Sequence, residues 1–458
     1  MSNASLQPGS AVDARLRKRV FASTFVGNVV EYYDFTLYGT LAAVVATHFF
    51  PKNDTVVGLL VAYVGVLLSY LIRPLAGLVL GPLADKRGRK TILVTTLFLM
   101  TIGTAGIGVL PTYAAAGVVA PVLLLLSRIL QGVGASVEYT TAANFLFEHE
   151  RGRRRNYISG VINASSSVGS LFAALVAFLC TSVLPAATFN SWGWRIPFLI
   201  AIPVAAIGFY IRNRLDETPD FKKMQQVLQE RQAKQTPLRT LFRYYWRDML
   251  KAIGLGAGQR VGSVIIQAYF VTALITAGFP VGQSLLVSIA TYVIGPFPSV
   301  WGGVLGDKYG ARVPLVVGYG AFIVLSIPTF LAINSGSIVV AGAAVVVFTV
   351  INNLLSPPLN VAYILTFPAE IRATAGAWTF NVGTAAIGGT AALIAVWLNS
   401  ITGSNLAFAV YLTAVCVISL LVSLFALPAV VNDKTELDLV AKHHSDSGVD
   451  AGTPAASS

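Results

Sequence analysis

The sequence predicts an all-α membrane protein with twelve transmembrane helices arranged as two six-helix pseudo-repeats. Three observations lead to this prediction: an apolar composition, a series of long apolar runs, and a loop motif that occurs twice. The chain has 458 residues, of which 55% are hydrophobic and only 11% charged, and its mean hydropathy is +0.71. Soluble domains carry about 25% charged residues. This composition therefore excludes a cytosolic enzyme and a disordered scaffold.

The apolar runs are long enough to be membrane-spanning helices. A helix needs about 20 apolar residues to cross the hydrocarbon core of a bilayer, and the runs are too long for the alternating strands of a membrane barrel. The twelve expected spans cover residues 19–48, 55–82, 91–111, 117–142, 157–182, 195–213, 250–277, 283–304, 313–333, 337–362, 374–398 and 404–428.

The positive charges fall on one side of these spans. Of the 32 Lys and Arg residues, 27 lie in the termini and in alternate loops, all on one side. By the positive-inside rule both termini are expected to be cytoplasmic, in a multi-pass protein of the inner (plasma) membrane. The net charge of +12 therefore indicates orientation and contact with anionic lipid, and no nucleic-acid partner is expected.

A long polar stretch between the sixth and seventh spans divides the chain into two halves. The expected organisation is an N-terminal cytoplasmic segment, a first six-helix bundle, a central cytoplasmic loop, a second six-helix bundle and a disordered cytoplasmic tail. These segments are predicted to cover residues 1–18, 19–213, 214–249, 250–430 and 431–458.

A short loop motif occurs in both halves. The sequences GPLADKRGRK (81–90) and GVLGDKYGAR (303–312) follow the second and eighth spans at a constant offset of 222 residues. The carboxylate of this motif can lie against a helix N-terminus or pair with a nearby cation, forming a latch that is made in one conformation and broken in another. The alternative is a basic loop that only sets topology. The predicted gating residues are Gly81, Asp85, Lys86, Gly88, Arg89, Asp307, Lys308 and Gly310.

These loops resemble the paired signature loops of the major facilitator superfamily. Further stretches resemble its metabolite:proton symporter family, which includes permeases for alpha-ketoglutarate, citrate, shikimate, proline/betaine and aromatic acids. The matching sequences are GNVVEYYDFTLYG (27–39), RPLAGLVLGPLADKRGRK (73–90), SRILQG (127–132), WGWRIPFL (192–199), LDETPDFKK (215–223) and FPAEIRATAGAWTFNVG (367–383). The resemblance implies proton-coupled transport by alternating access. The chain departs from the family at Ala135 and Ser136, where glycines are usual before an acid, and at Pro82, where a His is common.

Six ionisable residues lie inside the expected spans. They are Glu31, Asp34, Glu138, Arg73, Arg128 and Arg260. Insertion scales give a cost of about 2.5–3.5 kcal/mol for a charged residue at the centre of a membrane helix. These side chains must therefore face the interior of the bundle or a water-filled cavity, where a functional role is expected.

The acidic residues are candidates for proton coupling. Glu31 and Asp34 are one helical turn apart on one face, and Arg73 can pair with either of them. An acid that is poised between an Arg partner and desolvation can take up a proton when the partner is displaced. We expect Asp34 to be the proton carrier, with Glu31 as the second choice, and Glu138 to serve a gate or a proton exit. The alternative is a static ion pair that holds the first two spans together.

The cations indicate the polarity of a substrate. An Arg guanidinium matches a carboxylate with two parallel hydrogen bonds, so Arg73, Arg128 and Arg260 are predicted to bind substrate together with Tyr38, Gln267 and Tyr269. The sequence therefore predicts a symporter that imports a small organic acid (a mono-, di- or tricarboxylate) together with a proton.

Three alternatives remain open: a symporter for a zwitterionic osmolyte such as betaine or proline, an exporter, and a receptor without transport. A long heptad-patterned C-terminal tail would resemble the osmosensing branch of the family. The tail after residue 431 has no heptads, so the organic acid is preferred. No catalytic constellation, metal-ligand cluster, cofactor motif or GxxxxGK[ST] phosphate loop occurs in the sequence. The chain is therefore not expected to be an enzyme. We expect a monomer.

Overall fold

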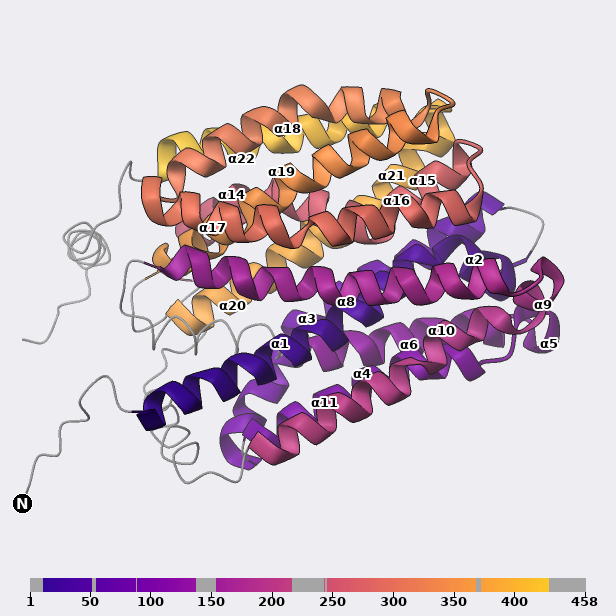
Figure 1. Ribbon diagram of the computed structural model, residues 1–458, viewed down its shortest axis with the longest axis horizontal. Helices are drawn as coiled ribbons and strands as arrows, with labels where there is room; N and C mark the ends of the chain where they lie inside the picture. Colours follow the sequence, from indigo (N-terminus) through magenta and orange to yellow (C-terminus); the bar gives the residue numbers. More distant parts are fainter. Residues whose placement is uncertain are drawn as a thin grey trace, which may run out of the picture.

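The computed structural model describes residues 11–51, 55–87, 89–136, 154–215, 243, 245–367 and 372–427. In these ranges every regular element is a helix, which confirms the all-α prediction. Figure 1 shows the helices running side by side along one direction, with those of the first half grouped below those of the second half. The central loop and the C-terminal tail of the predicted organisation lie largely outside the described residues.

The helices of the first half follow the first six predicted spans. Their bounds are α1 (Ala11–Thr40), α2 (Ala42–Phe49), α3 (Thr55–Arg87), α4 (Arg89–Val109), α5 (Tyr113–Ala116), α6 (Val119–Ala135), α8 (Arg155–Val183), α9 (Ala186–Ser191), the 3₁₀ helix η1 (Gly193–Arg195), α10 (Ile196–Leu199) and α11 (Ala201–Leu215).

The helices of the second half follow the other six spans. Their bounds are α14 (Trp246–Ala268), α15 (Phe270–Thr276), α16 (Val281–Ile294), α17 (Pro296–Tyr309), α18 (Arg312–Ile333), α19 (Ile338–Leu365), α20 (Arg372–Gly383), the π-helix η2 (Thr384–Gly388), α21 (Gly389–Thr402) and α22 (Leu406–Ala426).

Each of the twelve predicted spans corresponds to one helix or to consecutive helices. Within the described ranges, eight spans have the length and hydropathy that a membrane crossing needs, and α4 and α6 contain shorter apolar stretches. The pairs α1–α2 and α14–α15, the first span of each half, complete the set. The twelve-helix prediction is therefore confirmed, and many apolar side chains on the outside of the bundle, such as Phe425 and Val339, are exposed, as expected for a surface in lipid.

Several spans are interrupted, among them the sixth at Ile200 and the eighth at Gly295. The first span of each half breaks at Leu41 and Tyr269, and the eleventh span contains the π-helical turn η2. Discontinuous helices are common at transporter binding sites, and single π-turns are frequent at functional sites. These breaks indicate the region in which to look for a site.

The two halves meet through very close backbone contacts. At the end predicted to be cytoplasmic, α8 packs along α17, and a Cβ atom added at Gly303 would lie 2.4 Å from the carbonyl oxygen of Asn156. At the opposite end, a Cβ atom added at Gly39 would lie 2.5 Å from the Cα atom of Ala268. There the hydroxyl group of Tyr63 donates to the Ala268 carbonyl oxygen at 2.6 Å. The halves are therefore in contact at both ends in this conformation.

The contact at Gly39 predicts the effect of a single methyl group. Gly39→Ala places a Cβ atom against the backbone of Ala268, which cannot rotate away, so the closed arrangement of this end should be disfavoured by roughly 1–3 kcal/mol. A cysteine at the buried position Thr272 should then react faster with a membrane-impermeant maleimide. The matched control is Gly58→Ala, because a Cβ atom there meets its nearest neighbour at an ordinary 3.6 Å. Equal labelling rates in the two variants would contradict the prediction.

Candidate functional site

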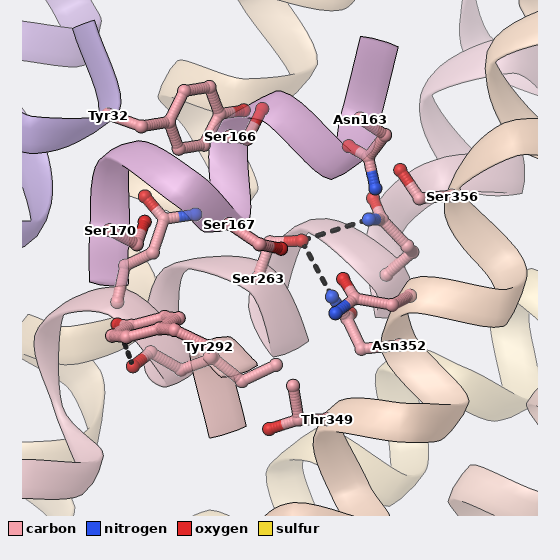
Figure 2. A pocket seen from close by; sticks show the side chains of 14 residues that line it. Tyr32, Asn163, Ser166, Ser167, Ser170, Ser263, Tyr292, Thr349, Asn352 and Ser356 are labelled. Carbon is pink, nitrogen blue, oxygen red and sulfur yellow. Dashed lines mark hydrogen bonds between the residues drawn. The ribbon is translucent and has the colours of Figure 1, made fainter. Parts of the chain in front are cut away.

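A polar cavity lies between the two halves, at the level of the helix breaks. Five helices line it: α1 and α8 from the first half, and α14, α16 and α19 from the second (Figure 2). Its lining residues are Tyr32, Asn163, Ser166, Ser167, Ser170, Gln259, Ser263, Ile266, Gln267, Tyr292, Thr349, Asn352, Asn353 and Ser356. None of these 14 residues is ionised at neutral pH, and all but Ile266 carry an amide or hydroxyl group.

Hydrogen bonds hold several of these side chains in place. The Ser263 hydroxyl oxygen accepts from Gln259 Nε2 at 2.9 Å and from Asn352 Nδ2 at 3.0 Å. The Tyr292 hydroxyl group donates to the Ile266 carbonyl oxygen at 3.1 Å. Asn163 Nδ2 donates to Ser299 Oγ across the interface of the halves, at 2.9 Å. The cavity wall is therefore a preorganised set of neutral donors and acceptors.

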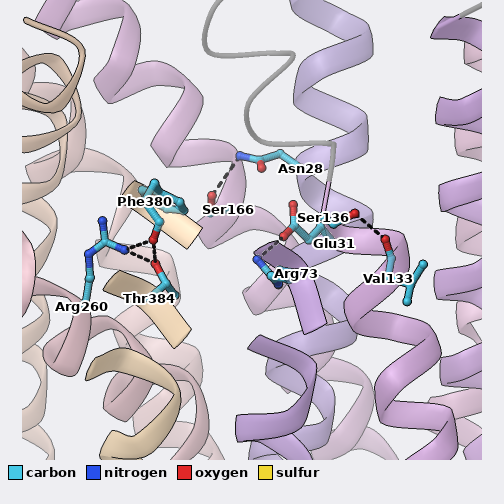
Figure 3. A network of polar contacts seen from close by, with 9 residues as sticks. All are labelled: Asn28, Glu31, Arg73, Val133, Ser136, Ser166, Arg260, Phe380 and Thr384. Carbon is cyan, nitrogen blue, oxygen red and sulfur yellow. Dashed lines mark hydrogen bonds and ion pairs between the residues drawn. The ribbon is translucent and has the colours of Figure 1, made fainter. Parts of the chain in front are cut away.

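The buried ionisable residues lie in two groups, one in each half (Figure 3). In the first half, Arg73 Nη1 is 3.2 Å from Glu31 Oε1, and both side chains are less than a tenth exposed. The guanidinium carbon of Arg73 lies 4.3 Å from the ring centre of Phe35 and 4.8 Å from that of Tyr70. Of the two acids that the sequence offered to Arg73, the structure pairs it with Glu31.

Arg128 is buried deeper in the same half-bundle. Its guanidinium carbon lies 4.0 Å from the ring centre of Tyr38, its Nε atom donates to the Gly65 carbonyl oxygen at 3.4 Å, and its Nη1 atom donates to Gln131 Oε1. The hydroxyl group of Tyr38 donates to the Ala62 carbonyl oxygen. Tyr38 therefore packs under Arg128, and neither residue is part of the cavity wall.

Asp34 has no comparable partner. Its side chain is 2% exposed, and neither carboxyl oxygen has a hydrogen-bond partner in the described part of the chain. Arg128, Glu31 and the hydroxyl group of Thr104 are its polar neighbours. Asp34 is therefore a buried acid that, among the described residues, is not held in an ion pair, unlike Glu31.

Arg260 is the charged centre of the second half. Its Nη1 atom donates to the Phe380 carbonyl oxygen and to Thr384 Oγ1, and its Nε atom donates to the Tyr363 hydroxyl oxygen at 3.2 Å. Phe380 and Thr384 border the π-helical turn η2, so Arg260 ties α14 to this interrupted span (Figure 3). Arg260 is not among the residues that line the cavity.

The structure thus brings together only part of the predicted binding set. Gln267 lines the cavity, whereas the Tyr269 hydroxyl group donates to Asn405 Oδ1 at 2.9 Å, away from it. Glu138 and Gly88 lie outside the described residues.

The neutral residues that form most of the wall were missed by the search for charges. Their signal is helical spacing within apolar spans: 163, 166, 167 and 170 on α8, and 349, 352, 353 and 356 on α19.

The second signature loop joins the two halves at the predicted cytoplasmic end. The Asp307 carboxylate accepts hydrogen bonds from the backbone N–H groups of Asn156 and Tyr157, at 2.9 and 3.0 Å, and from Asn156 Nδ2 at 3.0 Å. These N–H groups are at the first turn of α8, where a helix lacks internal acceptors and favours negative charge. Of the two arrangements that the sequence left open, Asp307 adopts the one against a helix N-terminus.

The other predicted gating residues surround these helix ends. Gly310 ends α17 with a positive φ of 77°, which glycine tolerates, and Lys308 is exposed beside the ring of Tyr309. Gly81, Asp85 and Lys86 belong to the last turns of α3, and Arg89 begins α4; the side chains at these positions are outside the described set.

Two helical half-bundles with a polar cavity between them and buried charges in each are typical of a membrane transporter. The chain matches the Major Facilitator Superfamily over residues 24–392 and belongs to that family. This confirms the resemblance carried by its signature loops. The family and the relatives described below are transporters, not enzymes.

Characterised relatives align over most of the chain. It is 34% identical to the proline/betaine transporter of Escherichia coli K12, over 89% of this chain and 83% of the relative. It is 32% identical to the glycine betaine/proline/ectoine/pipecolic acid transporter OusA of Dickeya dadantii, over 94% and 89% of the two chains. Among solved structures, a D-xylose-proton symporter has a TM-score of 0.70 at 17% identity, covering 91% of this chain and 98% of that one, and so shares the fold.

The Glu31–Arg73 pair predicts a strongly non-additive effect on stability. Arg73→Met leaves a buried carboxylate without its cation, which should cost about 3–5 kcal/mol, while the double variant Glu31→Gln/Arg73→Met should recover most of that loss. The measurement is the thermal unfolding midpoint in detergent. Lys251→Met is the control, because Lys251 pairs with Asp248 but is 55% exposed and an exposed pair contributes about 0.2–1 kcal/mol. If the changes in unfolding midpoint caused by the single substitutions simply added up in the double variant, the coupling would be refuted.

The contact of Asp307 with α8 predicts a shift in the balance of conformations. Asp307→Ala removes a cap whose loss typically costs about 0.5–2 kcal/mol, so the contact between α8 and α17 should open more often. A cysteine at the cavity residue Ser167 should then react faster with maleimide applied from the predicted cytoplasmic side. Asp248→Ala, which removes a carboxylate bound to Lys251 on its own helix, should leave the rate unchanged. An unchanged rate in Asp307→Ala would exclude a latch.

Proposed function

We propose that the protein is a proton-coupled symporter of the inner membrane that imports a small zwitterion of the proline or betaine type by alternating access. The relatives at 34% and 32% identity are named as transporters of proline, betaine, ectoine and pipecolic acid. They favour the alternative interpretation of the sequence over the organic acid. The missing heptads in the tail had argued against that alternative. However, that argument rests on the tail alone, whereas these relatives align with 89% and 94% of this chain.

The observation that carries the proposal is the absence of charge among the residues that line the described cavity. A di- or tricarboxylate would bring two or three negative charges into a site without a cation, and burying unpaired charge costs several kcal/mol per ion. A zwitterion has no net charge. Neutral amide and hydroxyl groups can satisfy its carboxylate and its ammonium end separately.

The substrate contacts are assigned to the neutral side chains that face the cavity. Gln259, Ser263 and Gln267 follow one another at intervals of four residues, about one turn, on α14, and Asn352 faces them from α19. Their N–H and O–H groups can donate to a carboxylate. Their oxygens can accept from the ammonium N–H groups of proline, and can face the positive trimethylammonium group of betaine, which has no N–H. Arg260 is then a residue that fixes the interrupted eleventh span beside this face of α14.

The proton-coupling step is assigned to Asp34. Its carboxyl group is buried without a hydrogen-bond partner, which supports a neutral acid in this conformation. Arg128 can stabilise the carboxylate once the proton has left. Glu31 is already neutralised by Arg73 and holds α1 to α3. Asp307 acts as a gate between the halves. Its hydrogen bonds to α8 are formed in this conformation and break when the cavity opens to the cytoplasm.

The experiment is uptake into proteoliposomes under an imposed pH gradient. Proline and glycine betaine should accumulate, and alpha-ketoglutarate should not. Asp34→Asn should abolish gradient-driven accumulation while leaving counterflow exchange of the same substrate, because exchange needs no net proton movement.

The control for this experiment is Asp248→Asn, which should behave as the wild type. Accumulation of the dicarboxylate but of neither zwitterion would overturn the substrate class. Gradient-driven accumulation in Asp34→Asn would overturn the assignment of the proton carrier.

A further inference from the structure

A chain of hydrogen bonds runs from Arg128 toward Asp34 through two residues that have no role so far. Arg128 Nη1 donates to Gln131 Oε1, and Gln131 Nε2 donates to the hydroxyl oxygen of Thr104 at 2.5 Å. Thr104 belongs to α4, and its hydroxyl group is the neutral polar neighbour of the Asp34 carboxyl group on α1. The hydrogen bonds therefore join α6 to α4, and they end beside Asp34 on α1.

The direction of this chain is fixed by chemistry. A guanidinium group only donates hydrogen bonds, so the oxygen of the Gln131 amide must face Arg128 and its NH₂ group must face Thr104. The Thr104 oxygen then accepts from Gln131, and its own hydrogen is left for another acceptor. The carboxyl group of Asp34 is the acceptor beside it that lacks a donor.

The chain is sealed from water and has little freedom to rearrange. Thr104 is fully buried, Arg128 and Gln131 are 1% exposed, and Asp34 is 2% exposed. Gly103 makes room for the Gln131 side chain, because a Cβ atom there would lie 2.6 Å from Gln131 Cγ. In a buried environment of this kind, hydrogen bonds to a charged group are stronger than in water.

Few other charged groups act on the Asp34 carboxyl group. Among the described residues, Arg128 on α6 and Glu31 on α1 itself are the charged side chains that act on it. Glu31 is neutralised by Arg73 on α3. The positive end of the chain, at Arg128, is therefore the dominant charge that Asp34 meets.

We propose that Gln131 and Thr104 are positioning residues that link Arg128 to Asp34 and set the pH at which Asp34 releases its proton. The inference rests on the proposed function, in which Asp34 is the proton carrier. When the cavity opens, the O–H bond of the Asp34 carboxylic acid breaks and its proton passes to water. Thr104 keeps its own proton and turns its hydroxyl group to donate to the new carboxylate, held in place by Gln131.

The size of the effect follows from the hydrogen bond that is lost. The chain stabilises the carboxylate, so without it Asp34 gives up its proton less readily and needs a higher pH. One hydrogen bond to a charged group corresponds to a shift of about one to two pH units. The midpoint of the pH profile of transport should therefore move upward by that amount in Thr104→Val and in Gln131→Leu.

The test compares pH profiles of substrate exchange in proteoliposomes, together with substrate-induced proton uptake in detergent followed by a pH-sensitive dye. Thr104→Ser keeps the hydroxyl group and should keep the wild-type midpoint. Thr101→Val is the matched control on the same helix, because the Thr101 hydroxyl group donates only to the Leu97 carbonyl oxygen at 2.7 Å. Thermal unfolding midpoints verify folding. Thr104→Val, which replaces a hydroxyl by a methyl group of similar size, tests the proposal by itself if Gln131→Leu does not fold.

The outcomes separate the inference from the proposed function. An upward shift of the pH midpoint in Thr104→Val and Gln131→Leu, absent in Thr104→Ser and Thr101→Val, supports the role of the hydrogen-bond chain. Lower rates with an unchanged midpoint would mean that these residues only pack the bundle, which overturns the inference and leaves the function intact. Substrate-induced proton uptake that persists in Asp34→Asn would overturn the proton carrier and, with it, the hydrogen-bond chain.

Discussion

The need to satisfy buried cations without water determines much of this structure. Three arginines lie inside apolar helices, and each is stabilised in a different way. Arg73 has an ion pair with Glu31, Arg128 has a ring beneath it and an amide beside it, and Arg260 has a carbonyl and two hydroxyl oxygens around an interrupted helix. Because each solution takes groups from several helices, the charges fix how the helices of each half pack.

The interface between the halves follows a different rule. It is formed by glycines in backbone contact and by neutral amide and hydroxyl groups, with the carboxylate of Asp307 against the first turn of α8. Each such contact is weak enough to exchange for water when a cavity opens. Buried charges that are held firmly within each half, together with weaker contacts between the halves, are what a protein needs if its halves move as rigid bodies.

The division between predictable and unpredictable parts of the site follows from this contrast. Charges in apolar spans stand out in a sequence because they are costly, so Glu31, Asp34, Arg73, Arg128 and Arg260 could all be found there. Neutral residues such as those of the cavity wall cost little in a helix and carry no such signal. The pairing of Arg73 with Glu31 rather than Asp34 also required the structure, since both acids lie within one helical turn.

The sequence by itself determined the fold class, the twelve spans and the family, because hydropathy and two signature loops act over short stretches of chain. Only the tertiary structure decided which residues meet: the uncharged cavity and the contact of Asp307 with α8 between the halves, and the hydrogen-bond chain from Arg128 to Thr104 within the first half. These depend on the rotation and depth of helices far apart in sequence. That geometry is set by how side chains of different helices pack together. The periodicity of one helix in the sequence does not predict this packing.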